Sequence, residues 1–254
     1  METFRPDGWG DITKIHEFYL NNNFCYPIKV ITENKIVGIG TAIYLNKTGW
    51  LAHIIVLPEF RNKGMGNFIV ESLKNKLINE LSCESISLIA TDLGFPVYIK
   101  NGFISQSEYC TYKRKIELKQ NYRVENFILT KNEHINEIFQ LDREISGEDR
   151  SRILKQYVYN SFLHISKNKV NGFYLPNLGE GLIVSNEKDL GTYLLSMQME
   201  KKDTIVVPVE NETARDTLLK NGYKETMKIR RMVFGKLFKW APEKIYSRVG
   251  GYIG

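Results

Sequence analysis

A short basic turn with two glycines is the part of the sequence best suited to hold a phosphate. It reads Arg61-Asn62-Lys63-Gly64-Met65-Gly66. Glycine has no Cβ, so backbone N–H groups can approach an anion closely, and Arg61 and Lys63 add positive charge. These features suit a pyrophosphate. The alternative is a plain tight turn with a solvated basic face. The GxxxxGK[ST] loop of nucleotide triphosphatases and the GxGxxG dinucleotide motif are both missing from the sequence.

The segments on either side would position this turn. An apolar strand is predicted over Trp50–Val56, and an amphipathic helix over Gly64–Leu81. The first amides of a helix have no intrahelical partner and lie at the positive end of the helix dipole, which favours anions. The helix prediction depends on apolar residues at helical spacing, namely Phe68, Ile69, Leu73, Leu77 and Leu81.

The remaining pattern predicts a mixed α/β chain. In the first half, other expected helices are Asp11–Asn21 and Pro96–Asn101, and other expected strands are Ile28–Thr32, Lys35–Leu45 and Ile86–Ala90. Turns are expected at Asn34 and Asn46–Gly49, because asparagine and glycine adopt turn conformations readily. In the second half we expect strands at Val124–Leu129, Phe173 and Leu182–Val184, and helices at Glu133–Glu144, Ser151–Phe162 and from Leu190.

The chain contains a weak internal repeat. Tyr98-Ile99-Lys100-Asn101-Gly102-Phe103 returns 120 residues later as Leu218-Leu219-Lys220-Asn221-Gly222-Tyr223. Self-similarity at this period indicates duplicated domains rather than a solenoid, whose repeats are about 20 to 50 residues long. We therefore predict two domains, residues 1–118 and 119–254, joined near the polar stretch Glu117–Tyr122.

Two ordered motifs resemble the GNAT superfamily of N-acetyltransferases. The first is Val56-Leu57-Pro58 followed by Arg61-Asn62-Lys63-Gly64-Met65-Gly66, which is similar to the family's V-x-P and R/Q-x-x-G-x-G/A motif. The second is the strand Ile86–Ala90 followed by Tyr98–Phe103. The whole chain resembles a two-domain subgroup with a degenerate GNAT-like C-terminal half, through Leu141–Arg150 and Pro242–Gly254. The resemblance implies tandem acyl-CoA N-acyltransferase folds built on mixed sheets.

The resemblance also implies roles for individual residues. Acetyl-CoA would be the co-substrate, and Tyr98 would protonate the departing thiolate. Thr91 stands where the family often has an asparagine, seven residues before this tyrosine. The strands on either side of the site would splay to open the cofactor groove. The cofactor-binding residues implied are Ile54, Ile55 and Val56 beside the pantetheine and thioester, and Arg61, Asn62, Lys63, Gly64, Met65 and Gly66 around the pyrophosphate.

The base that deprotonates the acceptor amine is left open. His53 lies on the central strand, but related enzymes carry catalytic residues at positions matching Trp50 and Ala52. Strand alternation places His53 on the face opposite Ala52, unless a bulge shifts the register. A core or supporting role for His53, and a water relay, are the alternatives. Three carboxylates of the second half could serve as the base or form a solvated helix end, namely Asp142, Glu144 and Asp149.

The second half lacks the features of a cofactor site. No R-x-x-G-x-G follows Leu182–Val184, and Glu187 and Asp189 would repel phosphate. Leu218 stands where the first half has Tyr98, although Asn211 is family-like. We therefore expect one cofactor site per chain, in the first half. The second half would shape the acceptor pocket or an interface.

Composition excludes several classes of protein. The 254 residues carry a formal charge of +6, and the segment Lys224–Arg248 alone has eight bases and two acids. No apolar run reaches the 18 or so residues of a membrane helix, and the N-terminus shows no export signal. The three cysteines form no CxxC pair, so we expect neither a metal nor a disulfide framework. A reduced, cytoplasmic protein that does not bind a membrane is expected.

The leading hypothesis is an N-acetyltransferase that moves an acetyl group from acetyl-CoA to a primary amine by direct attack. The acceptor would be a small molecule or a peptide, and a homodimer is compatible with the sequence. A non-catalytic acyl-CoA sensor is the alternative. A third hypothesis is binding of nucleic acid or an anionic surface by Lys224–Arg248, but no zinc-finger, RNP or basic-zipper pattern supports it. We therefore expect no nucleic-acid partner.

Overall fold

The computed structural model describes residues 12–115, 128–166 and 169–254, and these form two compact units. The first unit comprises the chain up to Gln106 with Arg231–Leu237 and Gly251–Ile253. The second comprises Ser107–Arg230 with Phe238–Gly250 and Gly254. The predicted domain boundary between residues 118 and 119 lies outside the described residues.

The first unit is built on a mixed sheet. Strands β1 to β3 form an antiparallel meander, β3 pairs in parallel with β4, and the part of β11 from Arg231 follows β4. Asn34 and Asn46 have φ values of 60° and 61°, so the predicted turns occur where asparagine tolerates the left-handed region. The strands are β1 (Cys25–Thr32), β2 (Lys35–Leu45), β3 (Thr48–Val56), β4 (Ser85–Ala90) and β11 (Lys224–Gly235).

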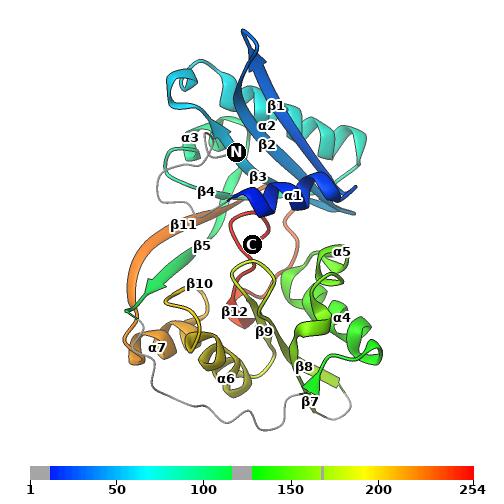
Figure 1. Ribbon diagram of the computed structural model, residues 1–254, viewed down its shortest axis with the longest axis vertical. Helices are drawn as coiled ribbons and strands as arrows, with labels where there is room; N and C mark the ends of the chain where they lie inside the picture. The colour runs from blue at the N-terminus through cyan, green and yellow to red at the C-terminus, as the bar shows by residue number, and fades with distance from the viewer. Residues whose placement is uncertain (1–11, 116–127, 167–168) are drawn as a thin grey trace. The chain divides into compact units, whose positions relative to one another are not determined.

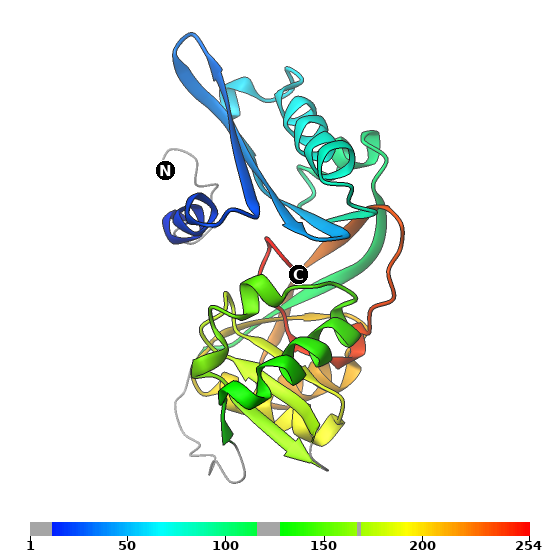
Figure 2. The same cartoon turned by 90° about the vertical axis from the view of Figure 1, so that its right-hand side faces the viewer.

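Two helices cover opposite faces of this sheet (Figure 2). Helix α2 (Met65–Asn75) packs Ile69 and Leu73 against β2. The contact is so close that a Cβ on Gly40 would lie only 2.6 Å from Ile69 Cγ2. On the other face, a smaller apolar cluster joins residues beside α1 (Thr13–Asn21) to Ile39 and Ile55. The predicted helix Gly64–Leu81 is thus α2 continued by one π-helical segment, Lys76–Glu80. A short helix, α3 (Phe95–Lys100), follows β4.

The second unit has its own antiparallel sheet, ordered β12-β9-β8-β7-β6 (Figure 1). It also contains the antiparallel pair of β10 and β5. The part of β5 from Ser107 onward belongs to this unit. A large apolar cluster fills the unit around Leu194, Ile205 and Leu218. The strands are β5 (Ile104–Lys113), β6 (Ile128–Leu129), β7 (Phe162–Ser166), β8 (Lys169–Leu175), β9 (Leu182–Ser185), β10 (Thr204–Pro208) and β12 (Ile245–Ser247).

Four α-helices complete the second unit, namely α4 (Ile135–Ser146), α5 (Ser151–Leu154), α6 (Lys188–Met199) and α7 (Glu212–Lys220). The predicted helix Ser151–Phe162 is wrong beyond Leu154, because the chain turns there and Phe162 begins β7. Single 3-10 turns occur at Pro58–Phe60, Asn132–His134, Val158–Asn160 and Pro242–Lys244. The mixed α/β fold class is confirmed, and the second sheet fits a tandem organisation.

Candidate active site

The glycine turn connects β3 to α2 and holds its shape with few side chains. Asn62 and Gly64 have φ values of 59° and 82°, which reverse the chain before the helix begins. Arg61 donates from Nε to the carbonyl of Val56 at 3.1 Å, so it ties the turn to the end of β3. Gly64 needs to be glycine because an ordinary side chain is strained at this φ.

The amides at the start of α2 are available to a ligand. The first helical bond runs from Phe68 N–H to the carbonyl of Gly64, so the amides of Met65, Gly66 and Asn67 precede the helical ladder. In the part of the chain that the structure describes, no side chain caps this helix start. A Cβ on Gly64 would meet no described atom within 4 Å, and one on Gly66 only Val97 Cγ2 at 3.9 Å. The turn is therefore an open cradle of N–H donors.

Strands β3 and β4 separate just before this cradle. Their parallel pairing covers only Thr48 to Trp50, where Trp50 lies beside Ser87. Beyond Trp50, β3 continues to Val56 with its β4-facing edge outside that ladder, while its other edge stays paired with β2. The predicted splay is present, and it leaves backbone groups of Ile54–Val56 along the open edge.

A β-bulge shifts the register within β3. Thr41 pairs with Ala52 and Ile39 pairs with Ile55, so His53 and Ile54 together lie opposite a single residue of β2. His53 takes φ 48°, as the extra residue of such a bulge can. Because of this, His53 contacts α1 on the same face as Ala52, contrary to simple alternation.

The imidazole of His53 is held within a group of aromatic rings. Tyr19 Oη lies 2.7 Å from His53 Nδ1, and the rings of His16 and Tyr252 have centroids 5.4 and 6.3 Å from that of His53. Burial, with a smaller effect of the charge on His16, lowers the pKa of His53 to about 4. His53 is therefore neutral at physiological pH and a weak proton acceptor.

Tyr98 lies on α3, which is tied to the start of α2. Asn101 donates from Nδ2 to Asn67 Oδ1 at 2.9 Å, and the Tyr98 ring packs edge-on against Phe103. The Tyr98 hydroxyl makes no hydrogen bond to any described residue. Burial raises its pKa to about 12, so the phenol stays protonated. The backbone carbonyl of Thr91 accepts the amides of Gly94 and Phe95, and these bonds close the turn before α3.

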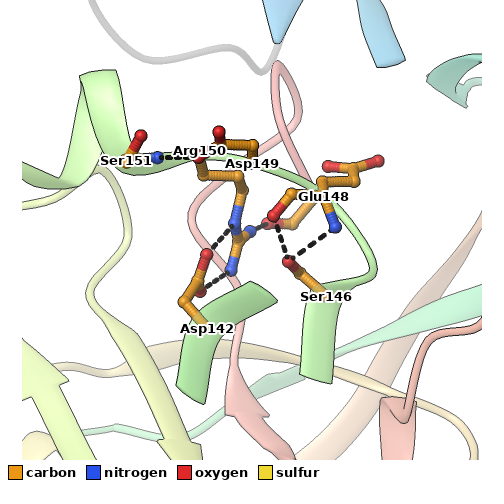
Figure 3. Close-up of polar contacts among 7 residues, drawn as sticks. Asp142, Ser146, Glu148, Asp149, Arg150 and Ser151 are labelled. Atoms are coloured by element: carbon orange, nitrogen blue, oxygen red, sulfur yellow. Dashed lines mark hydrogen bonds and ion pairs between the residues drawn. The ribbon is translucent and has the colours of Figure 1, made fainter. Parts of the chain in front are cut away.

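The acidic candidates of the second unit are engaged in ion pairs or exposed. Asp142 is buried and receives both Nε and Nη2 of the buried Arg150, at 3.0 and 2.5 Å (Figure 3). Asp149 pairs with Arg143 at 3.2 Å and accepts the Ser151 amide. Glu144 is exposed. Asp142 is therefore part of the core of this unit and not a solvated helix end.

At least four of the eight bases in Lys224–Arg248 are buried or paired with an acid. Arg231 and Arg248 are buried, with 5% and 6% of their surface exposed. Lys236 pairs with Glu84 at 2.8 Å, and Lys228 pairs with Glu225 at 3.7 Å. This pairing and burial weaken the hypothesis that the segment is a nucleic-acid surface.

Among the described residues, no group of three or more His, Cys, Asp or Glu could hold a metal ion. None of the described helices combines the length and the apolar character needed to span a bilayer.

Comparison with known proteins agrees with this geometry. Residues 2–102 match the model of the Acetyltransferase (GNAT) family. This part of the chain is a GNAT domain. The match includes β1 to β4, the glycine turn and Tyr98, and it ends at the last residue of the turn after α3. No curated protein matches the sequence.

Solved structures share the fold of the GNAT domain and of the rest of the chain. A proposed acetyltransferase from Pyrococcus horikoshii has a TM-score of 0.78 at 20% identity, covering 95% of this chain and 84% of that one. A GCN5-related N-acetyltransferase from Sphaerobacter thermophilus has a TM-score of 0.62 at 10% identity, covering 91% and 88%. At these identities the similarity is one of fold.

Proposed function

We propose that the first unit is an N-acetyltransferase that moves the acetyl group of acetyl-CoA to a primary amine on a small molecule or a peptide. The observation that carries the proposal is the continuity of two open features. The N–H cradle at Gly64–Gly66 follows the end of β3 at Val56 after one 3-10 turn, and Arg61 ties the two together through the Val56 carbonyl. A cofactor with a diphosphate at one end and an extended amide-bearing arm fits both.

The diphosphate is held by main-chain donors. The amides of Met65, Gly66 and Asn67 lack helical partners, and the dipole of α2 adds positive potential at the same place. Arg61 and Lys63 supply charge beside the turn, with Arg61 also fixing its shape through the Val56 carbonyl. The free space above Gly64 and Gly66 lets the anion reach the backbone.

The arm and the thioester run along β3. Acetyl-CoA supplies the activated acetyl group, and the open backbone edge of Ile54–Val56 orients it, as a neighbouring strand would. The bulge at His53 turns the backbone just ahead of this edge. Donors in fixed positions can polarise the thioester carbonyl and stabilise the negative charge that develops on its oxygen.

Tyr98 supplies the proton for the leaving group. The amine nitrogen forms the new C–N bond while the C–S bond breaks, and the sulfur accepts a proton from the phenol. The proton lost by the amine restores the phenol through solvent. With its pKa raised to about 12, Tyr98 is protonated when the reaction begins, and it hydrogen-bonds the developing thiolate before it gives up the proton.

A non-catalytic acyl-CoA sensor is the second candidate. The observation that favours it is the depressed pKa of His53, which makes this imidazole a poor base for an ammonium group. Under this hypothesis the cradle binds acyl-CoA but no acetyl group is transferred. A water relay to solvent would remove the need for a side-chain base and keep the enzyme hypothesis intact.

Thiol release from acetyl-CoA across a panel of amines tests the proposal. We expect release that depends on both acetyl-CoA and one class of amine. Tyr98→Phe, which keeps the ring packing, should lower kcat by about 10²-fold or more with little change in CoA affinity. Wild-type kcat in this variant would remove Tyr98 as the acid. CoA binding without transfer to any amine would favour the sensor.

A further inference from the structure

The second unit repeats the chain order of the first. The meander β7-β8-β9 leads into α6, β10 and α7, as β1-β2-β3 leads into α2, β4 and α3. The sequence repeat agrees with this correspondence, because it aligns α3 with α7. The place equivalent to the open edge of β3 is therefore the edge of β9 that faces away from β8.

That edge of β9 is not open, because β12 is paired with it. Ile245 pairs with Val184 and Ser247 with Ile183 in an antiparallel ladder. On its far side, the segment bonds to β10 through the Arg248 amide, which donates to the Val206 carbonyl at 3.2 Å. The segment thus bonds to both β9 and β10.

Asn211 holds β12 from the start of α7. Its Oδ1 accepts the Ala214 amide at 2.8 Å and caps the helix, while its Nδ2 donates to the Ile245 carbonyl at 3.0 Å. Asn211 lies seven residues before Leu218, at the spacing that separates Thr91 from Tyr98. The Asn211 side-chain amide is therefore bound to the chain's own backbone.

Tyr246 closes the end of the cleft nearest α6. A Cβ on Gly191 would lie 2.2 Å from the Tyr246 ring, so the ring rests directly on the first turns of that helix. At the helix start, Ser185 Oγ accepts the Glu187 amide at 3.1 Å. Both the surface and one of the donors that an anion would use are therefore taken by the protein.

We infer that β12 is a built-in occupant of the acyl-CoA cleft of a GNAT-like second unit. The strand takes the place that the pantetheine arm would take beside β9, and Tyr246 covers the helix that would face the diphosphate. The second unit therefore binds no CoA, and β12 is a permanent part of its sheet. This inference concerns the second unit and does not depend on activity in the first.

Hydrogen exchange on the full chain tests the occupancy directly. In the wild type, amides of 245–248 should exchange at least about a hundredfold more slowly than unprotected ones, with or without saturating CoA. Asn211→Asp keeps the oxygen that caps α7 but removes the donor to Ile245. It should speed exchange at 245–248 by about tenfold, with α7 unchanged, because one buried hydrogen bond is lost.

Two exchange results would overturn the inference. One is unprotected amides at 245–248 in the wild type, and the other is exchange there that CoA accelerates. If Asn211→Asp does not fold, the wild-type measurements with and without CoA still decide.

CoA calorimetry with Gly66→Glu separates the two units. This variant weakens the CoA site of the first unit, so we expect one CoA per chain in both proteins, with a higher Kd in the variant. A second CoA per chain in the wild type, or a site in the variant that keeps its wild-type Kd while another weakens, would place a site in the second unit and overturn the inference. Failure of the wild type to bind CoA would instead overturn the proposed function, while the exchange experiment continues to test β12.

Discussion

Replacing Gly66 with glutamate should make the protein more stable and its CoA affinity weaker. Gly66 is the second residue of α2, and a side chain there would meet only Val97 at 3.9 Å. Glutamate gains about 0.5 kcal/mol over glycine in helix propensity. Its charge at the helix start adds about 0.3–1 kcal/mol. The unfolding free energy should rise by about 1 kcal/mol, which raises the Tm by about 2–4 °C.

The same carboxylate lies where the diphosphate should bind. Two like charges about 4 Å apart repel by about 1 kcal/mol in water and about 4 kcal/mol at an effective dielectric constant of 20. The Kd for CoA should therefore increase by between about fivefold and about a thousandfold. Gly66→Gln has a similar shape and no charge, so it measures the steric part alone. Gly66→Ala adds only a methyl group and should bind nearly as the wild type does.

Thermal unfolding and calorimetry with CoA on the four proteins provide the measurements. The expected order of Kd is wild type and alanine, then glutamine, then glutamate, while the glutamate variant has the highest Tm. A glutamate variant that is folded and binds CoA with the wild-type Kd would refute the placement of the diphosphate. Gly64→Glu is a less clean choice, because φ 82° at this position strains any side chain.

Three other predictions address the interior of the protein. The pKa of His53 falls from about 6.5 in the unfolded chain to about 4 in the folded one. The folded protein is therefore most stable above pH 6.5, and its unfolding free energy should fall by up to about 3 kcal/mol as the pH drops toward 4. Chemical denaturation at a series of pH values should show this loss, and the loss should be smaller in His53→Asn. Asp142→Ala should cost about 3–5 kcal/mol because it removes the carboxylate that receives two N–H groups of the buried Arg150 guanidinium, whereas Asp149→Ala should cost less than about 1 kcal/mol, as urea midpoints can show. Gly191→Ala should cost about 1–3 kcal/mol through its clash with Tyr246, and adding Tyr246→Ala should cost less than the sum of the two single changes.

The parts of the fold that the sequence predicts well depend on local chemistry. The turns at Asn34 and Asn46 and the helix after Gly64 follow from residues close together in the chain. The same holds for the glycine turn, whose shape is set by Arg61 to Gly64. The site roles of the turn and of Tyr98 remain predictions.

The parts that the sequence misses depend on distant partners. Strand β12 is only three residues long and pairs with β9, about 60 residues earlier, so no local period marks it. The bulge that reorients His53 depends on the register against β2, which alternation alone does not contain. The predicted helix over Ser151–Phe162 fails beyond Leu154 because Ile153 and Leu154 are buried from the short helix α5 and Val158 from a separate 3-10 turn, at spacings that one longer helix would also give.

The sequence repeat does not show that two strands contribute residues to both compact units. Strands β5 and β11 each have residues in both units, and the first unit takes Arg231–Leu237 from a segment far along the chain. A duplication read from sequence suggests consecutive domains, since it compares motifs and not strand partners. The long-range pairings that complete each sheet are invisible at that level.

The edges of β3 and β9 occupy equivalent places in the two units, and the difference between them indicates which unit binds a ligand. Unpaired backbone groups next to a buried core are costly unless water or a ligand satisfies them. In the second unit, β12 pairs with the edge of β9 that faces away from β8, and Asn211 bonds to β12 in turn. In the first unit, the ladder of β3 with β4 ends at Trp50, and no further strand pairs with that edge among the described residues. A strand edge that is covered in one unit and open in the other indicates that the open edge is kept for a ligand that carries amides.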